Sequence, residues 1–563
     1  MTQDTFDVAI VGGGPVGVGL AVELGQRGIA CVLVERHLEP QPIPKGQNLS
    51  NRTLEHFYFW HCVDELRAAR IMPPGYPIGG VTTYRTLNSP YFLAQGHAQG
   101  HDLSARSGRG AGVRDYYFQS NERLPQYCTE AVLRERLKQL PSVKTLFGWT
   151  AERVEQDADG ASVTVVPSGE SAAPFYSWSA DTEQQTNQNA AEQSERQVVK
   201  AKYVVGCDGG RSLVRAAMGI DRGGRDFDQR MVLAVLRSKE LHEFLNRFPP
   251  ATTYRVMKPE LQGYWQFFGR IDVGEGFFFH APVPRDATPD NFDFLGLLHE
   301  AAGFPFHAEF DHIGFWDLRI MVASQYSLGR MFIAGDACHQ HPPYGGFGLN
   351  TGLEDAANLG WKLAASLQGW GGQTLLDSYG AERQPIFKET GEAMIAGGIE
   401  RDREWLERHN PDRDLAEFER AWAEYGVTRG SQPQTYEPHY EGSSVVMGPA
   451  DGVCSIHGRM AFKAEAGHHL APRVLSTGRN VYEELSDGFT LLALDADEGS
   501  VASLDAAARR SKVPLKVIRD TFRDGREAYE SRLVLVRPDQ YVVWAADAAP
   551  EDISSLFTRV TGR

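Results

Sequence analysis

A glycine-rich turn near the N-terminus constrains the fold of this chain more than any other feature. Gly12, Gly14 and Gly17 follow the apolar run of residues 6–11 at the G-x-G-x-x-G spacing. In this spacing the first glycine permits a tight turn, the second lets the backbone approach a pyrophosphate, and the third lets helix and strand pack closely. The apolar run has the pattern of a strand buried on both faces. We therefore expect an α/β, Rossmann-like fold with a dinucleotide bound at this turn.

The residues after the turn narrow the choice of dinucleotide. A helix is expected from Pro15 to about Arg27, with its N-terminal amides and positive dipole end facing the phosphates. The next strand, residues 30–34, ends in Glu35, about 20 residues beyond the glycines. A carboxylate there accepts hydrogen bonds from both ribose hydroxyls and repels a 2′-phosphate. The bound adenosine is therefore expected to be that of FAD or NAD rather than NADP.

Two later segments also end a buried strand at an aspartate. Asp208-Gly209 closes the apolar run 202–206, and Gly335-Asp336 closes the run 331–334. Carboxylates at the carboxyl ends of strands lie where open α/β sheets bind ligands. Thr351 and Glu354 then have the spacing of a capping box, which predicts a helix that begins there. Three such segments, far apart in the chain, indicate a discontinuous domain that holds FAD.

With these motifs the chain resembles the single-component, FAD-dependent aromatic hydroxylases of the p-hydroxybenzoate hydroxylase and phenol hydroxylase type. Gly335 to His339, with Gly348-Leu349-Asn350, match the family's GD signature, and Asp208-Gly209 with Arg215 match its DG signature. The resemblance implies bound FAD, NADH or NADPH as transient co-substrate, and O2, with a phenolic ring hydroxylated through a flavin hydroperoxide. Arg52 is implied to contact the FAD phosphates and Gln126 to lie beside the flavin. The full set expected to bind the cofactor is Gly12, Gly14, Pro15, Gly17, Glu35, Arg36, Arg52, Gln126, Asp208, Gly335, Asp336, Gly348, Leu349 and Asn350.

The signatures also divide the chain into domains. We expect an FAD-binding domain at 1–80, 110–225 and 325–400, an inserted mixed β-sheet substrate domain at 80–110 and 226–324, and a helical connector at 400–444. Residues 445–563 resemble the thioredoxin-like C-terminal domain of phenol hydroxylase relatives, without a CxxC pair. Packing or homodimerisation is its expected role. The polar segment 168–197 is expected to be a surface loop, with a functional lid as the alternative.

Candidates for catalysis and substrate binding come from the predicted substrate sheet and the GD loop. Tyr264, Gln266 and His280 lie in strand-like runs, and histidine suits proton transfer near neutral pH. The resemblance places Pro343 beside the site of oxygen transfer. Gln47 aligns with an aspartate of phenol hydroxylase relatives, and glutamine can orient a hydroxyl but cannot act as a base. Tyr264, His280 and Pro343 are the catalytic candidates, although strand packing for Tyr264 and an outer-face position for His280 remain open.

Composition limits the possible partners. The formal net charge is -16 with acids and bases interspersed, which argues against nucleic acid or an anionic membrane surface. No apolar run approaches the ~20 residues of a membrane-spanning helix. The six cysteines are scattered, so we expect reduced thiols and a cytoplasmic location. No His, Cys and Asp cluster has metal-ligand spacing, so no metal is expected.

Two other functions fit the same motifs. A tailoring enzyme could hydroxylate a polycyclic polyketide or antibiotic, or perform a Baeyer–Villiger insertion, on the same fold. An FAD-carrying interaction protein without turnover is the alternative from a different class, and the intact glycine set argues against it.

Overall fold

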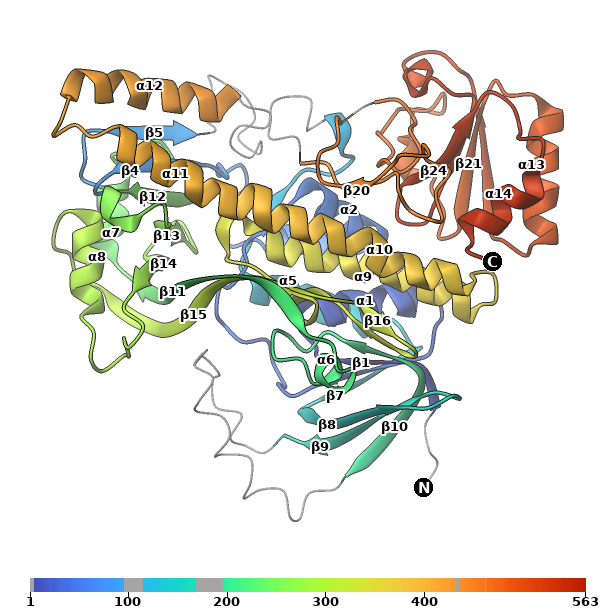
Figure 1. Cartoon of the computed structure of the whole chain (residues 1–563), viewed down its shortest axis with the longest axis horizontal. Helices are drawn as coiled ribbons and strands as arrows, with labels where there is room; N and C mark the ends of the chain where they lie inside the picture. Colours follow the sequence, from blue (N-terminus) through green and yellow to red (C-terminus); the bar gives the residue numbers. More distant parts are fainter. Residues whose placement is uncertain (1–4, 96–114, 169–195, 432–435, 461) are drawn as a thin grey trace.

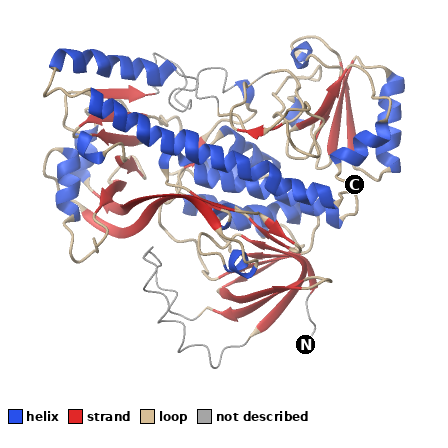
Figure 2. Cartoon of the chain, viewed as in Figure 1, coloured by secondary structure: helices blue, strands red, loops and turns tan. Residues whose placement is uncertain are grey.

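The computed structural model of the chain describes residues 5–95, 115–168, 196–431, 436–460 and 462–563. A mostly parallel sheet near the N-terminus, a large mixed sheet beside it and a C-terminal α/β unit form the molecule (Figure 1, Figure 2). The predicted α/β class is therefore confirmed. The predicted loop or lid at 168–197 lies almost wholly outside the described residues.

The first sheet has the strand order β16-β17-β10-β1-β2-β7. β1 pairs in parallel with β10 and β2, β10 pairs in parallel with β17, and β2 pairs in parallel with β7. Parallel pairing brings the carboxyl ends of β1, β2, β10 and β17 to one edge, where the glycine turn and the acidic motifs follow. The strands are β1 (Thr5–Val11), β2 (Cys31–Glu35), β7 (Val143–Phe147), β10 (Gln197–Gly206), β16 (Ser327–Leu328) and β17 (Met331–Ile333), and the hairpin β8 (Trp149–Gln156) and β9 (Ala161–Pro167) joins at β10.

Helices α1 and α9 pack against this sheet and against each other. α9 begins at Phe347, four residues earlier than the capping-box spacing predicted. The Thr351 hydroxyl donates to the Phe347 carbonyl at 2.8 Å and Glu354 pairs with Arg52, so neither side chain caps the helix. The helices of this region are α1 (Pro15–Gln26), α2 (Asn51–Phe59), α3 (Val63–Ala68), α5 (Gln126–Leu137), α6 (Leu213–Ala217), α9 (Phe347–Leu367) and α10 (Gln373–Glu389).

The second sheet has the order β18-β15-β11-β14-β13-β12-β4-β5. One face packs on α7 and α8 through Val232, Ala234, Phe277 and Phe279. Because side chains alternate along a strand, the neighbouring residues point to the opposite face, toward the FAD-binding part. The elements are β4 (Gly80–Tyr84), β5 (Phe92–Gln95), β11 (Arg222–Arg237), β12 (Thr253–Met257), β13 (Gln266–Arg270), β14 (Gly276–Val283), β15 (Glu309–Ala323), β18 (His339–Gln340), α7 (Lys239–Leu245) and α8 (Phe294–Ala302).

The C-terminal unit is a four-stranded sheet of order β22-β21-β23-β24 flanked by α13 and α14. β21 pairs in parallel with β22 and antiparallel with β23. The elements are β21 (Phe489–Leu494), α13 (Glu498–Arg510), β22 (Leu515–Asp520), β23 (Leu533–Val536), β24 (Val542–Ala546) and α14 (Ile553–Val560). One core cluster combines Trp361 of α9 and Leu375 of α10 with Phe489 and Leu491, so this unit packs directly on the FAD-binding part.

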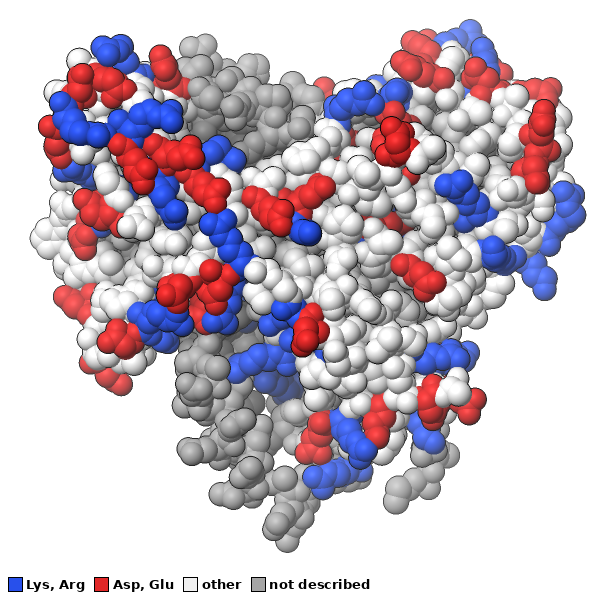
Figure 3. Space-filling view, viewed as in Figure 1, with Lys and Arg blue, Asp and Glu red and all other residues white. Residues whose placement is uncertain are grey.

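A long helical segment connects the two ends of the molecule. α10 continues through the π-helical turn Thr390–Ala396 into α11 (Gly397–Arg408), and α12 (Leu415–Ser431) follows (Figure 1). Among the described residues, no helix is long and apolar enough to cross a membrane. Acidic and basic side chains are interspersed over the face shown in Figure 3.

The glycine turn yields a prediction about stability. A Cβ on Gly17 would lie 1.9 Å from the Gly12 carbonyl oxygen, whereas a Cβ on Gly14 would meet none of the described atoms within 4 Å. We expect Gly17→Ala to lower the free energy of unfolding by at least about 3 kcal/mol, because the strand–helix contact must open. Gly14→Ala, the matched control, should unfold in urea like the wild type when the proteins are compared without FAD. Equal midpoints for both variants would contradict this packing.

Candidate active site

The glycine turn forms a cradle at the carboxyl edge of the parallel sheet. Gly12 has φ +100°, and a Cβ there would lie 2.4 Å from the Cys207 carbonyl oxygen. This close approach joins the turn to the strand that precedes Asp208. Gly14 is the N-cap of α1, none of the described side chains caps it, and the first turn contains no acid. The first amides of α1 therefore remain available to an anion, as pyrophosphate binding requires.

Glu35 lies beside this cradle. Its Oε2 accepts a hydrogen bond from the Gly13 amide at 2.6 Å, and its Oε1 accepts one from the His37 amide at 2.8 Å. A carboxylate has about four lone-pair sites, so two of them remain for ribose hydroxyls. Pro15 is the first residue of α1, and Arg36 follows Glu35 with an exposed side chain. Glu35 can therefore hold the turn and a sugar at once.

Asp208 and Asp336 lie at the ends of the next two strands. Asp208 Oδ2 accepts from the Leu213 and Val214 amides, whereas its buried Oδ1 has no partner among the described residues. Burial raises the pKa of Asp208 and of Asp336. Asp336 is nevertheless accessible to solvent, so its carboxyl lies in an open recess within the protein. Both acids can accept hydrogen bonds from a polyol chain at this edge.

A second helix N-terminus faces the same edge. Gly346, the N-cap of α9, is left-handed at φ 69°, none of the described side chains caps it, and the first turn is free of acids. Gly352 packs on α1, since a Cβ there would lie 2.7 Å from Val16 Cγ2 and 3.3 Å from Gly335 Cα. The amides of Gly348 and Leu349 belong to the helix turn whose N–H groups lack intrahelical acceptors. Two positive helix ends thus converge on one site.

The Asn350 side chain does not remain available to a cofactor. Its Nδ2 donates to the Asn48 and Gly346 carbonyls, and its Oδ1 accepts from the Ser50 amide and the Thr53 hydroxyl. These four bonds use both N–H donors and both lone pairs of the amide. The prediction that Asn350 binds the cofactor is therefore wrong for its side chain, which fixes the segment 48–53 against the start of α9.

Asp355 is a site residue that was not among the predicted candidates. Its Oδ2 accepts from the Gly335 amide at 3.1 Å and contacts His339 Nε2 at 2.7 Å, and its Oδ1 accepts from Arg383 Nε at 2.7 Å. All three side chains are at most 1 % exposed. Asp355 thus ties the GD turn to α9 and α10, and His339 has a structural role beside the turn.

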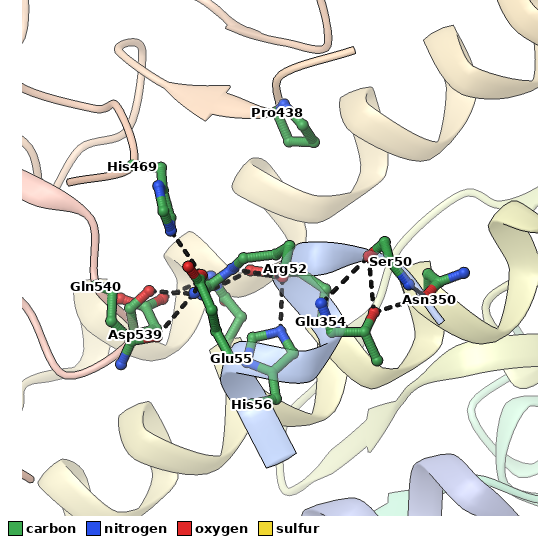
Figure 4. Close-up of polar contacts among 12 residues, drawn as sticks. Ser50, Arg52, Glu55, His56, Asn350, Glu354, Pro438, His469, Asp539 and Gln540 are labelled. Carbon is green, nitrogen blue, oxygen red and sulfur yellow. Dashed lines mark hydrogen bonds and ion pairs between the residues drawn. The ribbon is translucent and has the colours of Figure 1, made fainter. Parts of the chain in front are cut away.

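Arg52 corrects another prediction. Nε and Nη2 donate to the Glu354 carboxylate, Nη1 donates to Glu55 and Gln540, and Nη2 also donates to the Asp539 carbonyl (Figure 4). These five bonds use all five N–H donors of a guanidinium. In this structure Arg52 therefore has no donor left for an FAD phosphate, and it links α2 and α9 to the C-terminal unit.

Lys45 and Gln126 lie nearer to the cradle. Lys45 is exposed, and its charge opposes the rise in the pKa of Asp336 and of Glu130. Gln126 Nε2 donates to Glu130 at 2.8 Å. A Cβ on Gly46 would lie 3.1 Å from Leu349 Cδ2 and 3.4 Å from Gln126 Oε1, so the segment 45–46, Gln126 and the start of α9 are neighbours. Lys45 is a cation near these carboxyl groups that the sequence analysis missed.

An aromatic face of the second sheet lies opposite these groups. Two hydrophobic clusters join side chains of these strands to loops of the FAD-binding part. One cluster contains Ile43, and the other contains Tyr344 and Phe347. Trp265 belongs to both clusters and stacks on Tyr344 at 4.6 Å. The strand residues of this face are Met231, Leu233, Val235, Phe267, Phe278, His280, Trp316 and Leu318. It forms an apolar surface suited to an aromatic ring.

One substrate candidate points away from the site, and another lies beside the aromatic face. Gln266 is the first residue of β13 and shares its face with Phe268, which packs toward α7 and α8, so Gln266 points away from the site. Tyr264 precedes β13 and packs against the cluster that contains Tyr344, near the Arg403 guanidinium. Substrate contact by Tyr264 stays a prediction.

His280 lies on the aromatic face, but its protonation differs from the prediction. Burial lowers the pKa of His280 to about 4, and its Nδ1 accepts a hydrogen bond from Trp316 Nε1 at 3.3 Å. The ring is therefore neutral near pH 7, with its proton on Nε2. A group with this pKa is a weak base at neutral pH, which disfavours the expected proton-transfer role.

Gln47 and Pro343 keep positions consistent with substrate contact. Gln47 is buried, and its Nε2 has no partner among the described residues. Pro343 is half-buried and begins the turn of Tyr344–Gly346 that leads into α9. Substrate contact by either residue stays a prediction.

Among the described residues, one cluster of metal-ligating groups lies outside this site. His439, Glu441 and His468 place ligand atoms within 4.8 Å of one another, which sequence spacing did not indicate. Both nitrogens of His468 are engaged by Glu437 and Glu441, and these partners raise its pKa. The His439 and His468 rings are parallel at 6°, so their nitrogen lone pairs do not converge on one point. An imidazolium between two carboxylates accounts for this cluster.

The cradle, the two helix ends and the carboxylates together fit FAD, whose phosphates, ribose and polyol need these partners. The chain matches the family model for the FAD binding domain over residues 5–393 and that for the aromatic-ring hydroxylase C-terminal domain over residues 464–563.

Relatives extend the match over the whole chain. It is 28% identical to 4-methyl-5-nitrocatechol 5-monooxygenase of Burkholderia sp, over 98% of this chain and 96% of the relative. It is 29% identical to 12-dehydrotetracycline 5-monooxygenase/anhydrotetracycline 6-monooxygenase of Streptomyces rimosus, over 97% of this chain and 96% of the relative. The substrate-free structure of the rebeccamycin biosynthetic enzyme RebC is similar with a TM-score of 0.78 and 26% identity, and each chain is covered to 100%. The chain belongs to the FAD-dependent monooxygenases of the aromatic-ring hydroxylase type.

Proposed function

We propose that this chain uses NADH or NADPH and O2 to hydroxylate a phenolic aromatic substrate. The observation that carries the proposal is the aromatic face of the second sheet, set against the GD loop and opposite the cradle that fits FAD. Bound FAD would supply the electron transfer and oxygen activation that hydroxylation requires. The protein must hold the ring close to it and exclude water.

The described residues support these two tasks. Leu233, Val235 and Phe267 provide buried apolar surface, and Trp265 and Trp316 add partly exposed ring faces that can stack on an arene. The neutral His280 holds the Trp316 indole through the Nε1–Nδ1 bond, which fixes the plane of that ring. We therefore assign His280 to positioning of the aromatic surface and not to removal of the phenolic proton.

The uncapped start of α9 has a complementary task. A reduced flavin is anionic at its pyrimidine end, and helix N-terminal amides stabilise negative charge. Gly348 and Leu349 would supply those amides, and Asp355 keeps them in register with the GD turn through the Gly335 amide.

A tailoring function on a polycyclic substrate is the second candidate. Relatives named for tetracycline and tetracenomycin intermediates, and one named for rifampicin, match this chain at 27% to 29% identity, like the nitrocatechol enzyme. The two candidates differ in the size of ring system that the aromatic face must cover.

A substrate panel distinguishes these candidates. With single-ring phenols, catechols and hydroxybenzoates, we expect at least one compound to accelerate NAD(P)H oxidation about tenfold or more and to gain one oxygen atom by mass, since ring binding is coupled to flavin chemistry in the proposed function. Anthraquinones and tetracyclines form the second arm. Stimulation and product formation in that arm alone would replace the phenol proposal by the tailoring function.

Gly14 tests the cofactor assignment separately from catalysis. A methyl group at this position occupies the open space above the turn without clashing with the described residues. Gly14→Ala should raise the dissociation constant of the apoprotein for FAD about tenfold or more, because the backbone can no longer approach the pyrophosphate. Flavin fluorescence titration measures this, and unchanged affinity would contradict FAD binding at the cradle.

His280 gives a prediction about pH. The folded pKa of about 4 lies below the ordinary 6.5, so His280 does not change charge between about pH 6 and 8. His280→Gln should raise KM about fivefold through loss of ring positioning, while the pH dependence of kcat/KM keeps its shape over this range. Disappearance of an ionisation near neutral pH in the variant would restore His280 as the base.

A further inference from the structure

The turn between β23 and β24 of the C-terminal unit inserts into the FAD-binding part. Arg537, Asp539 and Gln540 belong to this turn and are only 2–3 % exposed. Gln540 Oε1 accepts from Arg52 Nη1 at 2.8 Å, and the Asp539 carbonyl accepts from Arg52 Nη2 at 2.7 Å (Figure 4). Arg52 in turn donates to Glu354 on α9. The turn therefore reaches α9 through one fully engaged guanidinium.

A second set of contacts reaches the same helix. Both Nη atoms of Arg537 donate to the Glu382 carboxylate at 2.9 Å, and Glu382 also accepts from Lys362 and from Asn358 of α9. Asn358 and Lys362 follow Glu354 at intervals of four residues, so the three side chains lie on one face of the helix. Lys362, Glu382 and Arg537 have fully buried side chains. The polar side chains on this face of α9 find many of their hydrogen-bond partners, directly or through Arg52, in the turn and in α10.

The opposite face of α9 contacts the cofactor cradle. Gly352 lies two residues before Glu354, which is about 200° around the helix, and it packs on Val16 and Gly335. α9 is thus held between the glycine-turn helix α1 and the C-terminal turn. A shift of the turn moves a rigid helix whose first amides are those of Gly348 and Leu349.

We propose that the turn Arg537–Gln540 supports the FAD site from outside it. The turn sets the position of α9 and thereby the affinity of the protein for FAD. Its residues are positioning residues, since they act through Arg52, Glu354 and Glu382 and do not contact the cofactor. The proposal rests on FAD binding by this chain and not on the identity of the aromatic substrate. It assigns the C-terminal unit a role beyond packing or dimerisation.

Gln540 offers a selective variant. Its backbone lies at φ 65°, a conformation that glycine adopts readily, so Gln540→Gly removes the contact with Arg52 without straining the turn. Arg537→Gln removes the pairing with Glu382. The matched control is Arg526→Gln, since Arg526 is equally buried in this unit and its partners are Asp520, Thr521, Asp524 and Val474, away from α9.

The experiment compares FAD affinity with thermal stability in full-length protein. We expect Gln540→Gly and Arg537→Gln to raise the FAD dissociation constant about tenfold or more. In the apoproteins, hydrogen exchange should accelerate at residues 347–355. Arg526→Gln should lower Tm and leave both readouts at the wild-type value. If Arg537→Gln does not fold, the FAD affinity and hydrogen exchange of Gln540→Gly decide whether the proposal holds.

The possible contrary results are distinct. Gln540→Gly could have a lowered Tm but keep the FAD affinity and the hydrogen-exchange rates of the wild type. That result would show that the turn only contributes packing, and it would overturn the proposal. An equal loss of FAD affinity in Arg526→Gln would show a general effect of destabilisation and would overturn it too. Wild-type protein that binds no FAD would instead refute the FAD assignment itself.

Discussion

The convergence of two uncapped helix N-termini on one sheet edge is the constraint on which this structure depends. The helices α1 and α9 both have a glycine as N-cap, and neither has an acid in its first turn. Their first amides lack intrahelical acceptors, and leaving buried amides unpaired is costly. An anionic cofactor satisfies both ends at once. The packing of Gly352 on Val16 fixes the distance between the helices, so the two positive ends act on one ligand.

Holding α9 in this place requires burying charges along its other side. Lys362 and Glu382 are fully buried, and burial lowers the pKa of Lys362 to about 8 even beside Glu382. Such groups are tolerated only when every one has partners, because an unpaired buried charge costs about 3–5 kcal/mol. Arg537 from the C-terminal unit provides part of that compensation. The FAD-binding part and the C-terminal unit are therefore bound electrostatically as well as by apolar packing.

The sequence allowed the FAD half of the site to be predicted because its chemistry is local. Gly12, Gly14, Gly17 and Glu35 lie within one strand–turn–helix–strand unit, and contacts within that unit support their roles. Arg52 was assigned wrongly for the opposite reason. Its position in a motif was clear, but its partners come from residues 354 and 539–540, which only the tertiary fold brings to it.

Asn350 and Thr351 show the same limit on a smaller scale. The side chain of Asn350 turned toward the segment 48–53, and the hydroxyl of Thr351 bonded back to its own helix. Both side chains could have capped or bound a ligand as far as the sequence shows. The start of α9 was instead set by the left-handed glycines Gly345 and Gly346, which place the helix one turn earlier.

The substrate half depends on strand register, and this explains why the family can be recognised when the substrate cannot. Whether Phe267 or Gln266 faces the FAD-binding part is decided by the register of β13 against β14, and a shift of one residue exchanges the two faces. The aromatic face carries no motif, since Phe267, Phe278 and Trp316 come from three different strands, β13, β14 and β15. The burial that makes this face apolar also neutralises His280. Charged groups therefore lie at the cofactor edge, whereas the aromatic face presents apolar surface and a neutral imidazole.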